Sequence, residues 1–490
     1  SRGLGDVYKR QEYSIRPGDR VAILMKNSPE FPLVFMALSS IGAVAVCLNS
    51  WWTSDELKYG FMDSKVKLVF TDEQRLAKIK GFVSEMGVQT VLCRHQNSDK
   101  SDEFWNSLLT SKNNELPRTT IDQDSDFAVM YTSGSTGHPK GVVMTHRGAI
   151  STLMSWHFGL RVLDVMGLGP VPYVDKNNQP YQPCQLVSVP FFHVSGTHGG
   201  LLLALWSGTK LVIMKKWDPP EAVRLIELEK VSRFGGVPTM AAEILGEAKK
   251  VGAKLESIRL IDTGGAARPA DQAREMAESI PNVLTGTSYG MTETNALGIA
   301  IRGKEYLENP EVTGRLIAPL AEMRIVDEFD NDVEIGDVGE LVLKSAANMR
   351  CYLNKDAETS EVLKDGWLYT GDLAKIDKNE LITLVDRKKN IIIRGGENIS
   401  AQEVQTVILE HPDVIEAAIF ALPNERLGEI VGACVFCGET SNVDEDSLKE
   451  FLRKSLAAYK IPEHIWFKKK PLPRVASEKI DVEALKKEYS

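Results

Sequence analysis

The chain has few cysteines and no excess of basic charge, and each shortage excludes a class of protein. Six cysteines in 490 residues are too sparse for a disulfide framework, so we expect a reducing compartment such as the cytoplasm. With 58 basic and 67 acidic residues the net charge is -9, which repels nucleic acid. We therefore expect a cytoplasmic protein that has no nucleic-acid partner.

Long hydrophobic runs are also missing. The longest uncharged stretch, residues 185–209, contains a proline, two histidines and four glycines, so it lacks the continuous apolar surface of a membrane-spanning helix. Hydrophobic residues make up 43% of the chain and charged residues 26%, an ordinary globular balance. This composition predicts a soluble protein with no transmembrane segment.

The order of apolar runs predicts an α/β fold. Strand-like runs such as Val21–Met25 and Val66–Phe70 alternate with helix-like segments such as Pro29–Ser40 and Pro219–Lys230, a rhythm typical of parallel sheets covered by helices. Closely spaced strands with turn signals over residues 314–344 indicate a smaller β-rich subdomain.

The length of the chain predicts more than one domain. We expect a large N-terminal domain over residues 13–387, built from two parallel-type α/β subdomains and the β-rich subdomain. Residues 388–490 then form a small mobile α+β C-terminal domain, with a hinge at Lys389.

A loop rich in glycine and hydroxyl groups follows the strand-like run that ends at Thr132. Glycines let the backbone approach a ligand, hydroxyls add hydrogen-bond donors, and Lys140 adds a positive charge, so the loop suits a polyphosphate. It is not a Walker A loop, because Lys140 follows Pro139 and precedes Gly141. A flexible surface loop would explain the glycines but not the lysine. The residues assigned to the loop are Thr132, Ser133, Gly134, Ser135, Thr136, Gly137 and Lys140.

Residues 131–142 resemble the phosphate loop of acyl-adenylate-forming enzymes, which include acyl-CoA synthetases, luciferases and nonribosomal adenylation domains. Further matches follow in the family's order as far as Lys479. They are Pro190–Gly196, Thr263–Ala266, Tyr289–Glu293, Tyr369–Leu373 and Asp386–Ile399. Within the last of these, Ile391–Ile399 most resembles the acyl-CoA synthetase branch, whose members bind ATP, magnesium and coenzyme A.

The resemblance implies roles for residues that bind the nucleotide. Tyr289 would stack on adenine, Asp372 would accept the ribose hydroxyls, and Arg387 would also reach the ribose. Glu293 would bind magnesium. Taken alone, these residues are a core tyrosine, a turn aspartate, a surface arginine and a solvated glutamate. The family pattern further adds Gly265, Ala266, Gly290, Thr292 and Lys479 to the ATP or AMP site.

The catalytic residues implied by the resemblance are His193, Lys140, Thr292 and Lys479. Without the resemblance, a histidine that lies among Phe191, Phe192 and Val194 is typical of a core residue. The family places it at the mouth of an acyl pocket, and the pocket residues that we predict are His193, Thr197, Gly265 and Gly290. Gly395 and Gly396 are expected in a channel for coenzyme A, which opens when the small domain rotates about Lys389.

Two departures from the family pattern concern the ends of the chain. Glu478 precedes Lys479, where the family usually has glycine. Residues 1–12 match nothing in the family, so we interpret them as an unrelated leader and expect the N-terminal domain to be truncated at its start.

The predicted reaction is ATP-dependent: a carboxylic acid and ATP give acyl-AMP and pyrophosphate, and coenzyme A then gives acyl-CoA and AMP. A fatty or other aliphatic acid is the first candidate, and a cinnamate- or benzoate-like aryl acid is the second. The same motifs also suit an acyl-AMP ligase that loads a carrier protein, or a catalytically silent nucleotide-binding protein. A silent protein should lack Lys140, Glu293, Asp372 or Lys479, and all four are present. Monomer and homodimer both remain open.

Overall fold

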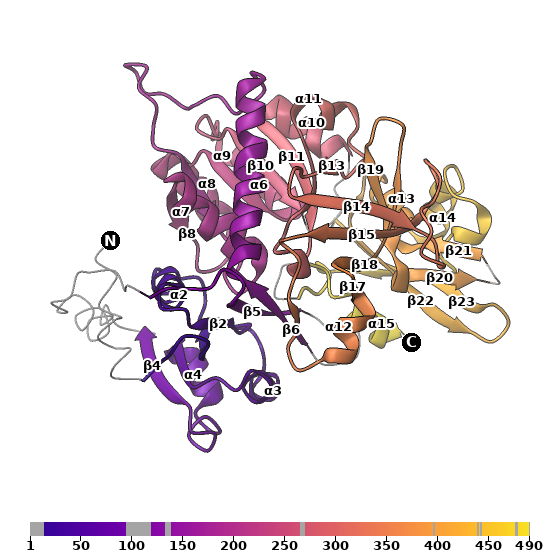
Figure 1. Cartoon of the computed structure of the whole chain (residues 1–490). Coiled ribbons are helices and arrows are strands. Elements are labelled where there is room, and N and C mark those ends of the chain that lie inside the picture. The colour runs from indigo at the N-terminus through magenta and orange to yellow at the C-terminus, as the bar shows by residue number, and fades with distance from the viewer. Residues whose placement is uncertain are drawn as a thin grey trace.

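The computed structural model describes residues 14–94, 119–132, 139–264, 270–394, 397–438, 441, 443–475 and 479–489. These residues form four sheets, two of seven strands and two of five (Figure 1). Helices cover the two large sheets and lie against the fourth. The predicted α/β class, with a large N-terminal domain and a smaller C-terminal one, is confirmed.

The first sheet has a parallel centre, and its last two strands at one edge run antiparallel. The central strand RVAIL is buried over four of its five residues, as its continuous apolar run predicts. In sheet order the strands are β16 (Cys351–Tyr352), β6 (Lys140–Thr145), β5 (Asp126–Thr132), β2 (Val44–Cys47), β1 (Arg20–Leu24), β3 (Leu68–Asp72) and β4 (Gln89–Arg94). The helices of this part are α2 (Glu30–Ser40), α3 (Ser54–Ser64), α4 (Glu73–Ile79) and α6 (His146–Val165).

The second sheet is parallel except for its last two strands, β12 and β13. Its order is β13 (Arg315–Leu316), β12 (Gly298–Arg302), β11 (Leu284–Gly290), β10 (Leu260–Gly264), β9 (Arg233–Gly236), β7 (Cys184–Val187) and β8 (Lys210–Ile213). The helical segments are η1 (Ser195–Leu202), α7 (Leu203–Ser207), α8 (Pro219–Glu229), α9 (Pro238–Val251), α10 (Ala270–Ser279), η2 (Thr292–Thr294) and α11 (Gly303–Glu308).

The third sheet is antiparallel and is the predicted β-rich subdomain, with different limits. We expected residues 314–344, whereas the sheet begins at Ala321 and extends to Arg387, and β13 pairs with the second sheet instead. The elements are β14 (Ala321–Val326), β15 (Gly339–Ser345), α12 (Asp356–Val362), β17 (Leu363–Lys364), β18 (Trp367–Ile376) and β19 (Ile382–Arg387).

The fourth sheet belongs to the C-terminal part of the chain, which enters it through the short helix η3 (Lys388–Asn390). The other elements are β20 (Ile391–Arg394), β21 (Glu397–Ser400), α13 (Ala401–Leu409), β22 (Val414–Asn424), β23 (Gly428–Cys437), α14 (Glu445–Leu452), η4 (Ala458–Lys460), β24 (His464–Lys468) and α15 (Val482–Tyr489). Among the described helices, none has both the length and the apolar character needed to cross a bilayer.

The parallel strands place several motif residues at comparable positions. Thr132 ends β5, Gly236 ends β9, Gly264 ends β10, and Gly290 ends β11. Ligands of parallel α/β sheets bind beyond the carboxyl ends of the strands, so this edge is where a site is expected.

Candidate active site

Tyr289 lies near the end of β11, and the turn after this strand carries Thr292 and the predicted magnesium ligand Glu293. Glycine is required at position 290, because a Cβ there would lie 2.4 Å from the carbonyl oxygen of Ala296. The backbone N–H of Met349 donates to the carbonyl of Glu293 at 2.6 Å and holds the turn from the other side. The position of Glu293 is therefore fixed by backbone contacts.

Glu293 is buried, not solvated, and the hydroxyl of Tyr352 donates to its Oε1 at 2.9 Å. Burial raises the pKa of this carboxyl; the Tyr352 hydrogen bond and Arg387 lower it, and Asp372 raises it further. A buried carboxylate with a raised pKa fits a ligand of a divalent cation, whose charge would favour the ionised form. Within the described ranges, no cluster of three or more His, Cys, Asp or Glu side chains could hold a metal.

Tyr352 also contacts Lys140, whose Nζ lies 4.9 Å from the centre of its ring. Pairing of β16 with β6 sets Tyr352 opposite Val142 and so brings the tyrosine beside the end of the phosphate loop. Lys140, Tyr352 and Glu293 thus form one connected group. Sequence reasoning missed Tyr352, because no motif marks it and only strand register places it here.

Asp372, Tyr289 and Arg387 meet in a second group. The hydroxyl of Tyr289 donates to Oδ2 of Asp372 at 2.6 Å, and Nε of Arg387 donates to Oδ1 at 3.1 Å. Asp372 and Arg387 face each other in the pairing of β18 with β19. Burial, followed by Asp372, raises the pKa of Tyr289. The structure brings these three predicted residues together, and their roles toward a ligand stay predictions.

The turn that carries Asp372 has its own support. Glu340, on β15, accepts from the backbone N–H of Gly371 at 3.0 Å and from Nζ of Lys388 at 3.2 Å. The hydroxyl of Thr370 donates to the carbonyl of Leu341. Glu340 therefore connects the turn that carries Asp372 to η3, a link that no sequence motif indicated.

Lys479 comes from the C-terminal part and lies near the Asp372 group. Its side chain reaches solvent. Even so, partial removal of water by the surrounding protein lowers the pKa of its amine, and the positive charge of Arg387 lowers it further. The negative charge of Asp372 raises that pKa. The loop before it is closed by the N–H of Val475, which donates to the carbonyl of Lys479 at 2.8 Å. An ion pair between Arg474 and buried Glu416 anchors this loop to β22.

His193, predicted at the mouth of the acyl pocket, lies close enough to Lys479 for that charge to act on its ring. Burial lowers the pKa of the imidazole to about 4, and Lys479 contributes to that lowering, so the ring is neutral near pH 7. Its Nε2 atom is buried and has no hydrogen-bond partner among the described residues. A neutral ring with an available nitrogen agrees with the expected role of steadying charge at a reacting carboxylate.

Helix η1, a π-helix, begins two residues after His193 and carries Thr197, which was predicted in the acyl pocket. Gly196 is required there, because a Cβ would lie 2.2 Å from the carbonyl oxygen of Pro190. Thr197 is fully buried, and its hydroxyl donates to the carbonyl of His193 at 2.9 Å. Its predicted place in the acyl pocket stays a prediction.

His198 and Asn295 join the acyl side to the nucleotide turn. Nε2 of His198 lies 3.0 Å from Oδ1 of Asn295, and Nδ2 of Asn295 donates to the carbonyl of Ala347 at 2.7 Å. Both side chains are fully buried. His198 is therefore a hydrogen-bonded core histidine, and sequence reasoning had not identified Asn295.

Several predicted residues lie outside the described ones, so the structure says nothing of their placement. They are Ser133, Gly134, Ser135, Thr136, Gly137, Gly265, Ala266, Gly395, Gly396, Glu478 and the side chain of Lys389. Residues 1–12, the predicted leader, are also outside the description.

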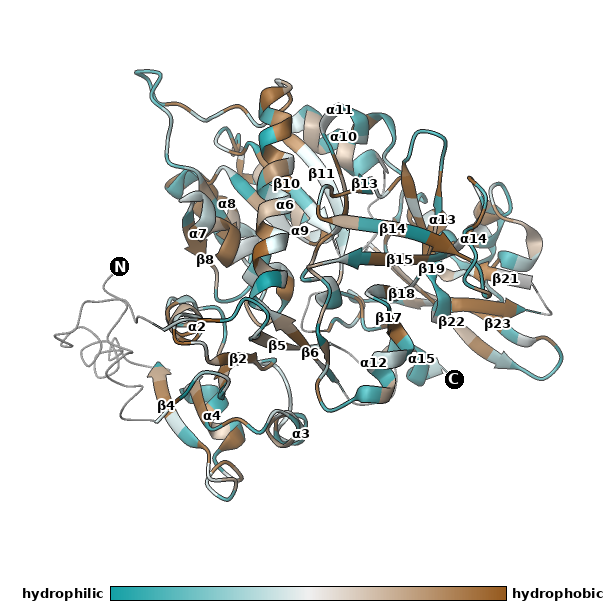
Figure 2. Ribbon diagram, in the orientation of Figure 1, coloured by the Kyte–Doolittle hydropathy of each residue, from teal (hydrophilic) through white to brown (hydrophobic). Residues whose placement is uncertain are grey.

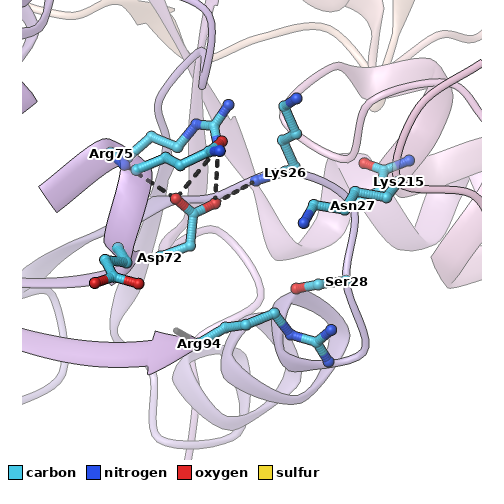
Figure 3. A pocket seen from close by; sticks show the side chains of 9 residues that line it. Lys26, Asn27, Ser28, Asp72, Arg75, Arg94 and Lys215 are labelled. Carbon is cyan, nitrogen blue, oxygen red and sulfur yellow. Dashed lines mark hydrogen bonds and ion pairs between the residues drawn. The ribbon is translucent and has the colours of Figure 1, made fainter. Parts of the chain in front are cut away.

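A small cavity of about 20 Å³ lies beside the loop after β1 (Figure 3). Arg75 and the backbone of Lys26 both bond Asp72 in its wall. Asn27 donates to the carbonyl of Val189 and accepts from the N–H of Phe191, so the wall braces the segment that leads to His193. None of the predicted site residues lines this cavity.

Comparison with known proteins gives two family matches. Residues 11–353 match the AMP-binding enzyme family, and residues 403–479 match the AMP-binding enzyme C-terminal domain. The chain is 30% identical over 459 residues to a 4-coumarate–CoA ligase of Nicotiana tabacum, covering 92% of this chain and 82% of the relative.

Two solved structures have a fold similar to that of this protein over almost the whole chain. A fatty acyl CoA synthetase of Mycobacterium tuberculosis has a TM-score of 0.72 at 28% identity, covering 100% of this chain and 91% of the other. An o-succinylbenzoate CoA synthetase of Bacillus subtilis, solved with ATP and a magnesium ion, has a TM-score of 0.79 at 26% identity, covering 99% and 92%. These matches confirm the predicted reaction class, an AMP-forming acid–CoA ligase. The chain belongs to the AMP-binding enzyme family.

Proposed function

We propose that this acid–CoA ligase activates a carboxylic acid with an uncharged, apolar tail, and that a fatty or other aliphatic acid is the first candidate. The observation that carries the proposal is the character of the acyl side. Residues 188–209 contain no Asp, Glu, Lys or Arg, and Phe191, Phe192 and Val194 are buried within them. A charged tail would find no counter-ion in this segment, whereas an apolar tail loses little by leaving water.

ATP, with magnesium, and coenzyme A are the cosubstrates. In the proposed first step, the positive charges of Lys140 and Lys479 offset the negative charge that gathers when a carboxylate attacks the α-phosphate. His193, neutral and next to Lys479, donates to the acid carboxylate through a ring N–H. Asp372 and Arg387 hold the ribose, Tyr289 packs on adenine, and Thr292 donates to the α-phosphate.

A bound magnesium ion would supply positive charge beside the phosphates of ATP. Glu293 is the proposed protein ligand, and its burial beside Tyr352 supports that role. The Tyr352 hydroxyl donates to Oε1, so Oε2 would be the oxygen left for the cation.

The proposed domain boundary follows Arg387. β19 ends at Arg387 in the third sheet, and β20 begins at Ile391 in the fourth, with Lys389 between them in η3. We propose that Lys389 is the hinge and that rotation about it exchanges Lys479 for the Gly395–Gly396 segment beside the adenylate. Thioester formation then uses that segment as part of the coenzyme A channel.

An aryl acid of the cinnamate type is the second candidate. The alignment with a 4-coumarate–CoA ligase, which is 30% identical and covers 92% of this chain, favours this candidate. The uncharged acyl side accepts an aromatic ring as readily as an alkyl chain.

A pyrophosphate-release screen tests the proposal. The panel holds saturated acids of increasing length, cinnamates and a dicarboxylic acid, each with and without coenzyme A. We expect release with apolar acids and acyl-CoA only when coenzyme A is present. A best rate on the dicarboxylic acid would overturn the apolar-tail proposal, and no release with any acid would favour a silent nucleotide-binding protein.

We also propose a cytoplasmic location. All six cysteines are free thiols, and four of them are buried, as suits a reducing compartment. Fractionation of cells that express the chain tests this proposal.

A further inference from the structure

Helix α6 carries an apolar stripe that the rest of the described structure leaves uncovered. Ile150, Met154, Phe158 and Val162 follow one another at intervals of four residues, and Val165 ends the helix. Each exposes more than a third of its surface, with 51% for Phe158 and 83% for Val165. In Figures 1 and 2, α6 stands in front of the molecule, and its ribbon alternates between hydrophobic and hydrophilic colour, with hydrophobic colour near its upper end.

Neighbouring segments extend the stripe. Leu205 and Trp206 of α7 are exposed, and the Trp206 ring lies 6.3 Å from that of His157 on α6. Met166 and Leu168, which follow α6 directly, are also exposed. We call these nine side chains the α6 patch: Ile150, Met154, Phe158, Val162, Val165, Met166, Leu168, Leu205 and Trp206.

The α6 patch is not needed to hold α6 in place. The first half of the helix buries a separate set of small residues, among them Ala149, Thr152 and Ser155, and it packs against η1 and β6. The second half, from His157 onward, contributes no fully buried side chain. Phe158, Val162 and Val165 therefore leave much of their apolar surface in solvent in a single chain.

The size of the α6 patch matches half of a protein interface. If each side chain offers about 90 Å² to a partner, nine of them offer roughly 800 Å². That is about the area that each partner buries in a standard stable interface, and it exceeds the largest apolar patch of a typical monomer, about 300–600 Å².

We propose that the α6 patch is a homodimer interface, in which α6 packs on α6 of a second copy across a two-fold axis. Two copies that each carry a net charge of -9 repel one another, so a surface that joins them has to be uncharged. The patch contains no charged side chain, and Arg161 beside it is paired with Asp164 at 3.1 Å.

The spacing within the stripe supports the same partner. Side chains four residues apart form a ridge that fits the groove beside an identical ridge, the commonest way for two helices to pack. A two-fold axis lets one surface serve both partners, with no second complementary patch. The interface leaves Lys479, His193 and Asp372 outside it, so the proposal does not depend on the identity of the acid.

Sedimentation or light-scattering measurements of the purified full chain test the dimer. We expect a concentration-dependent dimer for the unchanged protein, and Phe158→Glu to weaken self-association at least about 100-fold, because it places two like charges at the axis. Phe329→Glu is the matched control: Phe329 is 76% exposed, lies on the third sheet's Asp327–Asn331 turn and should leave the dimer intact. Both variants should keep the pyrophosphate-release rate, and Phe329→Glu should also keep the melting temperature.

A cross-link locates the interface. Phe158→Cys should join to itself through a short bis-maleimide, while Met62→Cys, exposed on α3, should not. A protein that stays monomeric at all concentrations would overturn the proposal, as would a dimer that Phe158→Glu does not weaken. Sedimentation of the monomer with neutral phospholipid vesicles, lost in Phe158→Glu, would assign the patch to a lipid surface instead and would also overturn it.

Discussion

The two sides of the candidate site differ in how their polar groups are satisfied. On the nucleotide side, Asp372 already accepts from Tyr289 and Arg387, and Glu293 already accepts from Tyr352. On the acyl side, Nε2 of His193 has no hydrogen-bond partner among the described residues. The first group is held in shape by its own hydrogen bonds, whereas His193 has a ring nitrogen that no described residue bonds.

This difference explains why the cosubstrates are easier to recognise than the acid. ATP carries charges and hydroxyls that demand particular donors, acceptors and cations, so the nucleotide side needs specific residue types at fixed places. An apolar tail demands only space and an uncharged wall, which many residue combinations provide. Predictions that change one side at a time test whether the two sides have these separate roles.

Removing Lys479 should have the largest effect. Lys479→Ala takes away the positive charge next to Arg387, Asp372 and His193, and we expect the rate of adenylate formation to fall about 1,000-fold. Pyrophosphate release measures this step. The conversion of supplied acyl-AMP to acyl-CoA should change much less, because the lysine acts in the first step.

Lys470→Ala is the matched control, since Lys470 is an exposed lysine nine positions earlier in the same part of the chain. Its rate should equal that of the unchanged enzyme. Adenylate formation that survives in Lys479→Ala would remove the lysine from the mechanism.

His193→Ala should lower adenylate formation about 10- to 100-fold, because it removes the donor proposed for the acid carboxylate. His193→Gln should recover part of the rate, since an amide can donate from a similar position. His464→Ala, an exposed histidine on β24, serves as the control.

The pH profile adds a sharper test of the same residue. The pKa of His193 is about 4, so its ring stays neutral from pH 5.5 to 8. Titration of His193 should therefore cause no change in rate within that range, and the rate profiles of the unchanged enzyme and of His193→Gln should have the same shape there. A limb near pH 6.5 that vanishes in the variant would mean that the imidazole titrates at its ordinary pKa.

Tyr352→Phe should have a smaller effect, on the nucleotide side alone. The hydroxyl lowers the pKa of Glu293, so its loss leaves burial to raise that pKa further. We expect adenylate formation to fall about 5- to 10-fold, the magnesium concentration for half-maximal rate to rise, and the acidic limb of the rate profile to move to higher pH. Tyr181→Phe, on an exposed tyrosine, should change none of these, and an unchanged magnesium dependence in Tyr352→Phe would separate Tyr352 from the cation site.

Local patterns predicted the elements well and the contacts between distant elements less well. The apolar run at Val21–Met25 became β1 within one residue at each end, and the expected helix at Pro29–Ser40 begins only one residue later. Tyr289, Asp372 and Arg387 were found because each lies in a motif. Tyr352, Glu340 and Asn295 were missed, because their roles depend on the pairing of β16 with β6 and on turns that meet only in the folded chain. The limits of the β-rich region were wrong for the same reason, since nothing local shows that β13 joins β12.

The smallest expected effect concerns His198, which joins the two sides through Asn295. Burial lowers the pKa of its imidazole to about 4, although the hydrogen bond to Asn295 opposes that change. Unfolding returns the pKa to about 6.5, so between pH 6.5 and pH 4 the unfolded chain binds more protons than the folded one. Stability is therefore lost as the pH falls through this window, by roughly 2 kcal/mol at pH 5.

His198→Gln keeps a donor for Asn295 and removes the titration, so its melting temperature should fall by a few degrees less between pH 7 and pH 5 than that of the unchanged protein. His464→Gln, at an exposed site, should show the full fall, and an equal fall in His198→Gln would mean that this histidine is not held neutral by the fold.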